Sequence, residues 1–294
     1  DYSPRLKFVT SALTTVLSFL KERGVETTPF SMSVRSELDD EETGAKYGLG
    51  SSAAVVTSVV TAVLEKFLRY RPARSLIFKF ASIALVRTQG SGSGADIAAS
   101  TYGGVLHYKS FQASWLKKEM NKTKRILPIL QKNWPYLHIE QIYFPENIYV
   151  CIGWTGNPAS TKNLVSEITK LKRDKQDVYS RFLRDSRQAV QQILTSIEEN
   201  DIPLFLEGIT KNRQALARLG ELAQVPIETE KLAQLSNLAE QLDGAGKLSG
   251  AGGGDCGLAF LTSEAACTTI QKKWETYHIQ PLALKVDPEG TVLM

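Results

Sequence analysis

Apolar residues along the chain follow helical spacing in some segments and strict alternation in others. Those between positions 8 and 20 recur every three to four residues and predict a helix that ends at Gly24. The alternation in F-S-M-S-V-R-S-E-L predicts a half-buried strand over 30–38. Two further helices are predicted, over about 51–70 and 74–87.

In the second half of the chain, predicted strands flank a long segment of helical spacing. After a strand predicted over 102–108, a buried strand over 147–154 leads through a turn into about eighty residues of mostly helical spacing. A strand over 256–261, a helix and a final strand over 281–286 close the chain. This order predicts an α+β fold of two domains, over 1–140 and 141–294.

Composition excludes several classes of protein. With 43% apolar and 22% charged residues, the 294-residue chain is typical of soluble globular proteins. A net charge of +4 gives no case for nucleic acid, and the basic stretch at 117–125 is interpreted as a solvated loop or helix face. No apolar run is long enough to predict a membrane partner.

Cysteines and histidines indicate neither disulfides nor a metal centre. The three cysteines form no C-x-x-C pair, which fits a reducing, cytoplasmic location. His107, His138 and His278 are widely separated in sequence, so each is interpreted as a surface or core histidine rather than a metal ligand.

The first glycine-rich segment, K-Y-G-L-G-S-S-A-A at 46–54, precedes a predicted helix. Glycines allow close approach to a ligand, and the first amides of a helix are unpaired and partly positive, so the segment suits phosphate. Ser51 and Ser52 are able to cap the helix, bind phosphate oxygens or hold Mg²⁺. A plain capped helix start is the alternative. No G-x-x-x-x-G-K-[ST] motif is present.

Two more glycine clusters follow. In G-S-G-S-G-A-D-I-A-A-S at 90–100, Asp96 is either a helix cap or a carboxylate that orients groups for phosphoryl transfer. The stretch from Ala251 to Gly254 offers consecutive flexible amides for an anion. Ordinary connections need only one or two glycines, so three such loops favour phosphate binding.

These segments, in this order and spacing, resemble the superfamily named for galactokinase, homoserine kinase, mevalonate kinase and phosphomevalonate kinase (GHMP). The resemblance covers essentially the whole chain. K-Y-G-L-G-S-S, S-E-L-D-D and G-W-T-G-N-P-A-S-T-K-N-L-V are most similar to the bacterial phosphomevalonate kinase branch. It implies a mixed α/β sandwich domain followed by a ferredoxin-like α+β domain.

The resemblance also implies ATP and Mg²⁺, and it assigns roles to residues. Asp96 matches the catalytic aspartate, Lys46 is expected to neutralise phosphate charge, and Ser51 or Ser52 is expected near the magnesium. Ser93, Gly94 and Ala251 are expected at the substrate. The nucleotide is expected to contact Gly48, Leu49, Gly50, Ser51, Ser52, Ala53, Gly252 and Gly253.

The acceptor phosphate needs a cradle of its own. In P-A-S-T-K, Pro158 suits a first helical position, Ser160 and Thr161 offer hydroxyls beside helix amides, and Lys162 adds charge. The alternative is a well-capped helix with a surface lysine.

The implied activity is phosphorylation of 5-phosphomevalonate to 5-diphosphomevalonate. The alternatives are mevalonate kinase, diphosphomevalonate decarboxylase, and a nucleotide-binding relative without turnover. Neither the P-G-K-type motif nor the G-E-x-x-V segment with which the family opens precedes the helix at 8–20. We therefore expect a first domain without its opening strands. The sequence leaves open whether the chain is a monomer or a homodimer.

Overall fold

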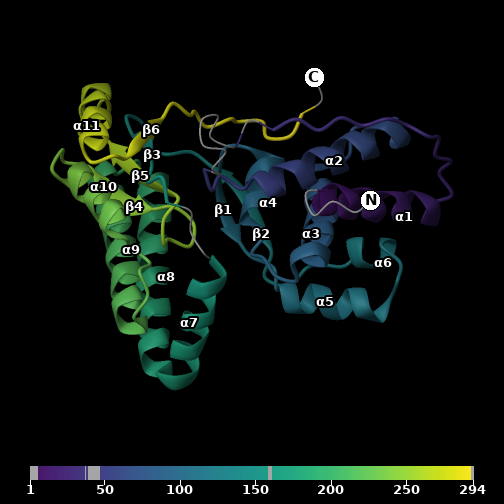
Figure 1. Cartoon of the computed structure of the whole chain (residues 1–294), viewed down its shortest axis with the longest axis horizontal. Helices are drawn as coiled ribbons and strands as arrows, with labels where there is room; N and C mark the ends of the chain where they lie inside the picture. The colour runs from purple at the N-terminus through teal and green to yellow at the C-terminus, as the bar shows by residue number, and fades with distance from the viewer. Residues whose placement is uncertain (1–5, 37, 39–46, 158–160, 293–294) are drawn as a thin grey trace. The chain divides into compact units, whose positions relative to one another are not determined.

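The computed structural model describes residues 6–36, 38, 47–157 and 161–292, and Figure 1 shows the order of its elements. The chain divides into two compact units. The first comprises 1–37, 50–142 and 286–294, and the second 38–49 and 143–285. Residues 38–49 and 286–294 thus belong to a different unit from the residues next to them in sequence. The domain division at 140/141 remains a prediction.

The first unit is a helical layer beside an antiparallel two-stranded sheet, β1–β2. The register runs from Val105 opposite Ile142 to Lys109 opposite His138. Its elements are α1 (Lys7–Glu22), α2 (Ser51–Leu68), α3 (Arg74–Gln89), α4 (Ala95–Tyr102), β1 (Val105–Lys109), α5 (Ala113–Lys122), α6 (Leu127–Leu130) and β2 (His138–Ile142).

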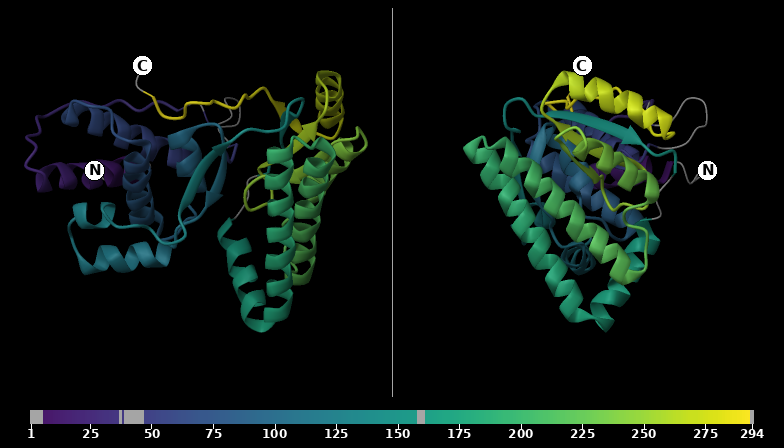
Figure 2. Two further views of the ribbon diagram at one scale, coloured as in Figure 1. Left: turned by 180° about the vertical axis from the view of Figure 1, so that it is seen from behind. Right: turned by 90° about the vertical axis from the view of Figure 1, so that its left-hand side faces the viewer.

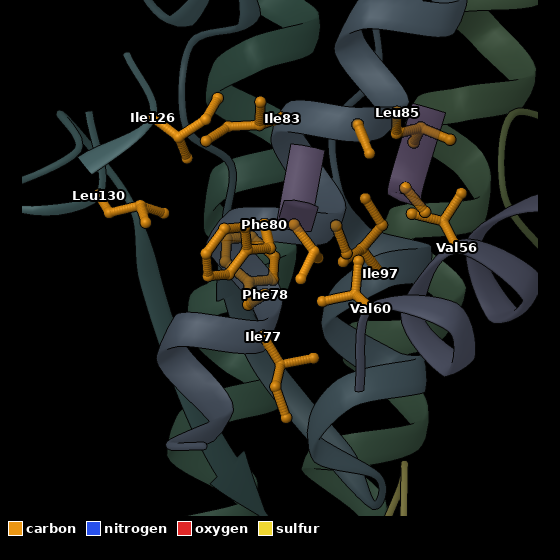
Figure 3. Close-up of a cluster of buried hydrophobic side chains, with 14 of the residues drawn as sticks. Val56, Val60, Ile77, Phe78, Phe80, Ile83, Leu85, Ile97, Ile126 and Leu130 are labelled. Atoms are coloured by element: carbon orange, nitrogen blue, oxygen red, sulfur yellow. The ribbon is translucent and has the colours of Figure 1, made fainter. Parts of the chain in front are cut away.

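Helix α3 is the centre of the core of the first unit. Its residues 80–86 are all buried, because other helices cover it on several sides. Phe78 and Phe80 lie among branched aliphatic side chains such as Val60 and Ile97, as Figure 3 shows. Helix α2 is apolar and long enough to cross a membrane by length and composition alone, but its buried face forms part of this core. This helix therefore leaves the expectation of no membrane partner as it stood.

The second unit combines a four-stranded antiparallel sheet of order β4-β5-β3-β6 with helices. Figure 2 shows the long α8 and α9 side by side. Its elements are β3 (Tyr149–Trp154), α7 (Thr161–Asp174), α8 (Gln176–Glu199), α9 (Ile202–Ala223), α10 (Glu230–Glu240), β4 (Ala245–Leu248), β5 (Cys256–Leu261), α11 (Glu264–Thr276) and β6 (Gln280–Leu282).

Local chemistry explains where several of these helices begin. Asp201 accepts a hydrogen bond from the Leu204 amide at 2.9 Å and so caps α9, while Thr229 and Ser263 cap α10 and α11 in the same way. The sheet lies close to α10 because glycines face each other on neighbouring strands. A Cβ on Gly153 or Gly257 would approach Leu235 of α10 to 2.8 Å.

Some elements differ from the sequence prediction. No strand is assigned to residues 30–36, the described part of the strand predicted over 30–38, because alternation alone does not determine whether a segment joins a sheet. Strands β2 and β4 were not predicted. Helix α5 takes up most of the basic stretch at 117–125, which agrees with its interpretation as a solvated helix face.

Candidate functional site

The first glycine loop ends in a backbone conformation that suits glycine. Gly50 is the N-cap of α2 with φ +77°, and it offers no side chain to cap the first amides of the helix. The amides of Ala53 and Ala54 donate to its carbonyl at 2.9 and 3.1 Å. The amides of Ser51 and Ser52 have no acceptor within the described chain, and unpaired amides at a helix start are suited to bind phosphate.

Asp96 lies beside this loop within the first unit. It is in the first turn of α4, whose N-cap is Gly94 at φ +76°. A Cβ on Gly50 would be only 3.2 Å from the Cβ of Asp96. The structure thus brings the first and second motifs together.

The environment of the Asp96 carboxyl disfavours its charged form. The residue is exposed as a whole, but partial burial of the carboxyl raises its pKa, and the hydrogen bond from the Ile97 amide at 3.0 Å opposes the shift. Because Gly94 is the N-cap of α4 and no side chain caps the helix, the capping interpretation of Asp96 is wrong; its carboxylate accepts a local hydrogen bond from the Ile97 amide of the same turn.

Two hydroxyls fix the segment that leads into α4. Tyr108 donates to the Ser93 carbonyl at 2.6 Å, and the single proton of the Ser110 hydroxyl is within reach of both the Ser93 carbonyl at 2.7 Å and the Phe111 carbonyl at 2.8 Å. A Cβ on Gly94 would lie 2.7 Å from the ring of Phe111, so no larger residue fits beneath this clamp. Burial also raises the pKa of the Tyr108 phenol, which therefore stays protonated and donating at neutral pH. Sequence reasoning missed Tyr108 and Ser110.

In the second unit, the beginning of the first motif meets the end of the third. A Cβ on Gly48 would lie 2.6 Å from the Cβ of Asp255. The Cys256 thiol donates to the Tyr47 carbonyl at 3.2 Å, and the rings of Tyr47 and Trp154 lie edge to face at 5.2 Å. Asp255 was not predicted as a site residue, although its position directly after the glycine run was a usable signal.

The third glycine loop is braced from behind by a neighbouring loop. The Gly253 amide donates to the Ile227 carbonyl at 2.8 Å, and a Cβ on Gly252, at φ +77°, would overlap that same carbonyl. These glycines are therefore required by a close backbone approach. A cavity of about 230 Å³ lies beside Gly253, and its lining includes Asn163 and Leu164 of the first turn of α7.

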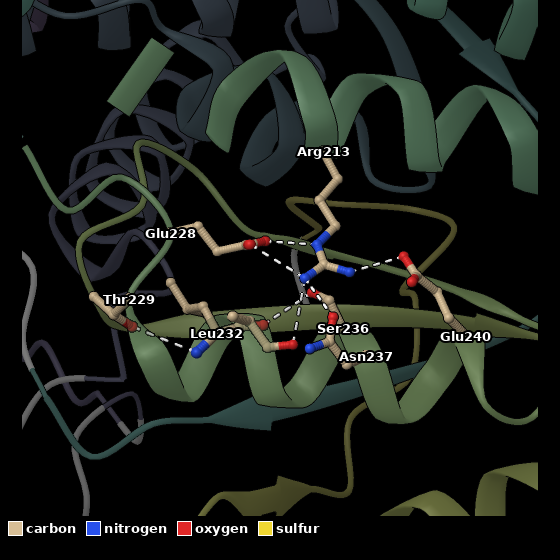
Figure 4. A network of polar contacts seen from close by, with 8 residues as sticks. Arg213, Glu228, Thr229, Leu232, Ser236, Asn237 and Glu240 are labelled. Atoms are coloured by element: carbon tan, nitrogen blue, oxygen red, sulfur yellow. Dashed lines mark hydrogen bonds and ion pairs between the residues drawn. The ribbon is translucent and has the colours of Figure 1, made fainter. Parts of the chain in front are cut away.

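Arg213 of α9 holds the bracing loop in place. Its guanidinium donates to Glu228 at 2.7 and 3.2 Å, to Glu240 at 2.8 Å and to the Asn237 carboxamide at 2.7 Å, as Figure 4 shows. Arg213 is buried, and Glu228 follows Ile227 directly. This network therefore ties α9 and α10 to the loop that supports the third motif.

Other predicted residues stand apart from these contacts. Lys46 and Ser160 lie outside the described residues, and Thr161 and Lys162 begin α7 without a described side chain. Lys247 of β4 was missed. Burial lowers its pKa, and its ammonium makes no hydrogen bond or ion pair within the described chain.

Comparisons with known proteins identify the family of the chain. A family model described as GHMP kinases N terminal domain matches residues 8–104, and one described as GHMP kinases C terminal matches 193–279. The expected loss of an opening N-terminal motif therefore finds no support.

Relatives of known sequence span most of the chain. A phosphomevalonate kinase of Streptomyces sp. (strain CL190) is 36% identical over 287 residues, which cover 97% of this chain and 76% of the relative. A mevalonate kinase of Pyrococcus abyssi is 28% identical and covers 97% of this chain and 73% of its own length.

Solved structures match equally broadly. A crystal structure of a Listeria innocua protein has a TM-score of 0.92 and 36% identity, covering 98% of this chain and 80% of its own. A structure of Streptococcus pneumoniae phosphomevalonate kinase in complex with phosphomevalonate and AMPPNP has a TM-score of 0.85 and 26% identity, covering 98% and 83%. The α+β fold prediction is confirmed, and the chain belongs to the GHMP kinase family.

Proposed function

We propose that the chain is a phosphomevalonate kinase, which phosphorylates 5-phosphomevalonate with ATP. The observation that carries the proposal is the 36% identity to a phosphomevalonate kinase over 97% of the chain, which exceeds the 28% identity to a mevalonate kinase. The streptococcal structure in complex with phosphomevalonate and AMPPNP supports the same substrate pair.

The reaction exchanges one phosphorus–oxygen bond for another. An oxygen of the terminal phosphate of 5-phosphomevalonate forms a bond to the γ-phosphorus of ATP, and the bond from that phosphorus to the β,γ-bridging oxygen breaks. The products are 5-diphosphomevalonate and ADP. No covalent link to the protein is needed, so the work of the protein is to position two anions and to offset their repulsion.

The nucleotide is assigned to the first and third glycine loops. The Ser51 and Ser52 amides of α2 have no acceptor within the described chain, and the third loop adds the backbone amides of 251–254 apart from that of Gly253, which donates to the Ile227 carbonyl. Mg²⁺ prefers oxygen ligands, and the hydroxyls of Ser51 and Ser52 and the Asp96 carboxylate provide them near one loop. When bound, the metal supplies positive charge at the transferred phosphoryl group.

Asp96 is assigned a positioning role rather than that of a strong base. The second pKa of a phosphate monoester is about 6, so the acceptor is mostly dianionic at neutral pH and has no proton to lose. Its closeness to Gly50 allows Asp96 to orient phosphate groups or a metal-bound water. Lys46 is assigned to charge neutralisation beside the same loop.

The acceptor is assigned to the second motif, the third motif and the start of α7. Ser93, Gly94 and Ala251 belong to the two motifs, and the remaining groups are those of Ser160, Thr161 and Lys162. A cytoplasmic location is also part of the proposal, since all three cysteines are free thiols.

The test is ADP release with Mg²⁺ and ATP, measured separately with 5-phosphomevalonate, mevalonate and 5-diphosphomevalonate. We expect turnover with 5-phosphomevalonate alone. Asp96→Asn should lower kcat about a hundredfold while leaving the KM for ATP within a few fold, because misplaced groups slow the chemical step more than they weaken nucleotide binding. Preferred turnover of mevalonate would overturn the substrate assignment.

A further inference from the structure

The two-stranded sheet β1–β2 carries a cluster of potential metal ligands that the phosphoryl-transfer site does not use. His107 lies directly opposite Glu140 in the register, and His138 is two residues before Glu140. Neighbouring positions on a strand alternate between faces, so the three side chains share one face of the sheet. The next residue, Tyr108, faces the other way and holds the Ser93 carbonyl.

The side-chain atoms are already close enough to share one ion. The Nε2 atom of His138 is 3.0 Å from Oε2 of Glu140, and Nδ1 of His107 is 3.7 Å from the same oxygen. The three ligand atoms all lie within 4.8 Å of one another. With Zn–N and Zn–O distances of about 2.0–2.2 Å, tetrahedral ligands are about 3.3 Å apart, so small side-chain rotations would complete the geometry.

Two charged side chains near His107 act on a bound cation in opposite directions. Lys109 repels a cation, whereas the Glu140 carboxylate attracts it and offers an oxygen ligand.

We propose that His107, His138 and Glu140 bind one divalent transition-metal ion of the Zn²⁺ class, separate from the magnesium used with ATP. Two imidazoles and one carboxylate are a ligand set typical of zinc sites that keep an open fourth position, whereas Mg²⁺ prefers oxygen ligands alone. Glu140 and His138 are substantially exposed, which gives the ion access from solvent. The assignment does not depend on the kinase activity.

The distances show why sequence reasoning failed here. His107 and His138 are separated by thirty residues in the chain, and their register is set by the pairing of β1 with β2. Their ring centroids are 4.7 Å apart in the fold. His107 and His138, which are distant in sequence, are therefore neighbours in the fold, whereas His278 is not part of the cluster.

Zinc titration of the whole, nucleotide-free chain by calorimetry tests the proposal. We expect one Zn²⁺ per chain, bound at least about tenfold more weakly after His138→Gln or Glu140→Gln. His278→Gln is the matched control, because His278 is the remaining histidine of the sequence and should leave the affinity unchanged. Circular dichroism and ADP release should show that the variants remain folded.

Cobalt substitution identifies the ligands independently. Co²⁺ bound to two imidazoles and a carboxylate should give visible d–d absorption. It should lack the near-ultraviolet band of a cobalt–thiolate bond, and the absence of that band would exclude the Cys267 thiolate as a ligand. The proposal is overturned if the parent chain binds no Zn²⁺, if His138→Gln and Glu140→Gln bind it as tightly as the parent does, or if the thiolate band dominates. Any of these results leaves the cluster as a hydrogen-bonded cross-strand group.

Discussion

Gly50 and Asp96 are 46 positions apart in the sequence, yet the Cβ of Asp96 lies 3.2 Å from the point where a Cβ on Gly50 would be. The loop that begins α2 and the carboxylate of α4 are thus held in contact by the fold of the first unit. This contact places an acidic side chain next to the proposed phosphate-binding amides.

Gly50→Ala should cost only modest folding stability but a large part of the activity. The alanine would be strained at φ +77°, costing about 1–2 kcal/mol, and its methyl group would also push Asp96 away. We expect kcat/KM for ATP to fall about a hundredfold in steady-state assays.

Gly24→Ala is the matched control for this substitution. Gly24 has a similar φ of +67°, but nothing lies within 4 Å of its Cβ position. It should lose comparable stability in urea titrations and keep its activity. Equal kinetic losses in the two variants would show that backbone strain, and not contact with Asp96, matters.

Asp96→Asn should make the protein more stable at neutral pH. Burial raises the pKa of this carboxyl in the folded state above its ordinary value of 3.8, so folding disfavours the carboxylate. The stability from the protonated form is fully present below pH 3.8 and is lost as the pH rises through the folded-state pKa. The advantage of asparagine should therefore appear at neutral pH and fade in acid.

Thermal melts across pH check this sign. Asp174→Asn is the control of opposite sign, because a hydrogen bond from Arg173 lowers the pKa of Asp174. Its parent carboxylate stabilises the fold above pH 3.8 and loses that effect as the pH falls. A Tm of Asp96→Asn at or below that of the parent at neutral pH would refute the assigned desolvation.

Tyr108→Phe combined with Ser110→Ala should slow the reaction more than either change alone. Each hydroxyl by itself can satisfy the Ser93 carbonyl, so one deletion costs about 1 kcal/mol of stability and the double deletion leaves the carbonyl without its side-chain donors. Because these are positioning residues, kcat should fall in the double variant while the KM for ATP changes little.

Tyr136→Phe removes a hydroxyl from a residue that is 72% exposed and should change neither parameter. If the kcat of the double variant equals that of the parent, the hydroxyl clamp does not position α4.

Arg213→Met should destabilise the second unit strongly. It leaves the largely buried Glu228 without its cation, a loss of about 3–5 kcal/mol, whereas the pair with the more exposed Glu240 adds about 1 kcal/mol or less. Activity should fall as well, because the loop at 225–228 braces the third glycine motif. Chemical unfolding and ADP release measure the two effects.

Arg218→Met on the same helix is the comparison. Arg218 is half exposed and its ion pair with Asp185 is long at 3.7 Å, so its loss should cost less than about 1 kcal/mol. Similar losses for the two variants would contradict the bracing role of Arg213.

Helices with a buried face were predictable from the sequence, whereas non-local pairing was not. The periodicity over 8–20 led to α1, and the apolar run after Ser51 led to α2. The alternation over 30–38 corresponds to no strand at the described positions 30–36, because periodicity alone does not determine strand pairing. Strand β4 has only four residues, and its Gly246 closely approaches Ser236 of α10, a contact that local periodicity does not report.

The candidate site, like the fold, contains residues that were predictable from the sequence and residues that were not. Glycine motifs were recognisable because positive φ and close backbone approach restrict these positions to glycine. Asp255, Tyr108 and the His107–His138 pair were missed, because the partners that give them meaning lie far away in sequence. Their roles follow only from the pairing of strands and the contacts between loops.

The most direct measurement is ³¹P NMR of the chain mixed with ATP, Mg²⁺ and 5-phosphomevalonate. The proposed activity predicts that the monoester signal of 5-phosphomevalonate is replaced by the two coupled signals of a diphosphate ester, with one ADP formed for each. ADP accompanied only by inorganic phosphate, or an unchanged monoester signal with ATP intact, would contradict it.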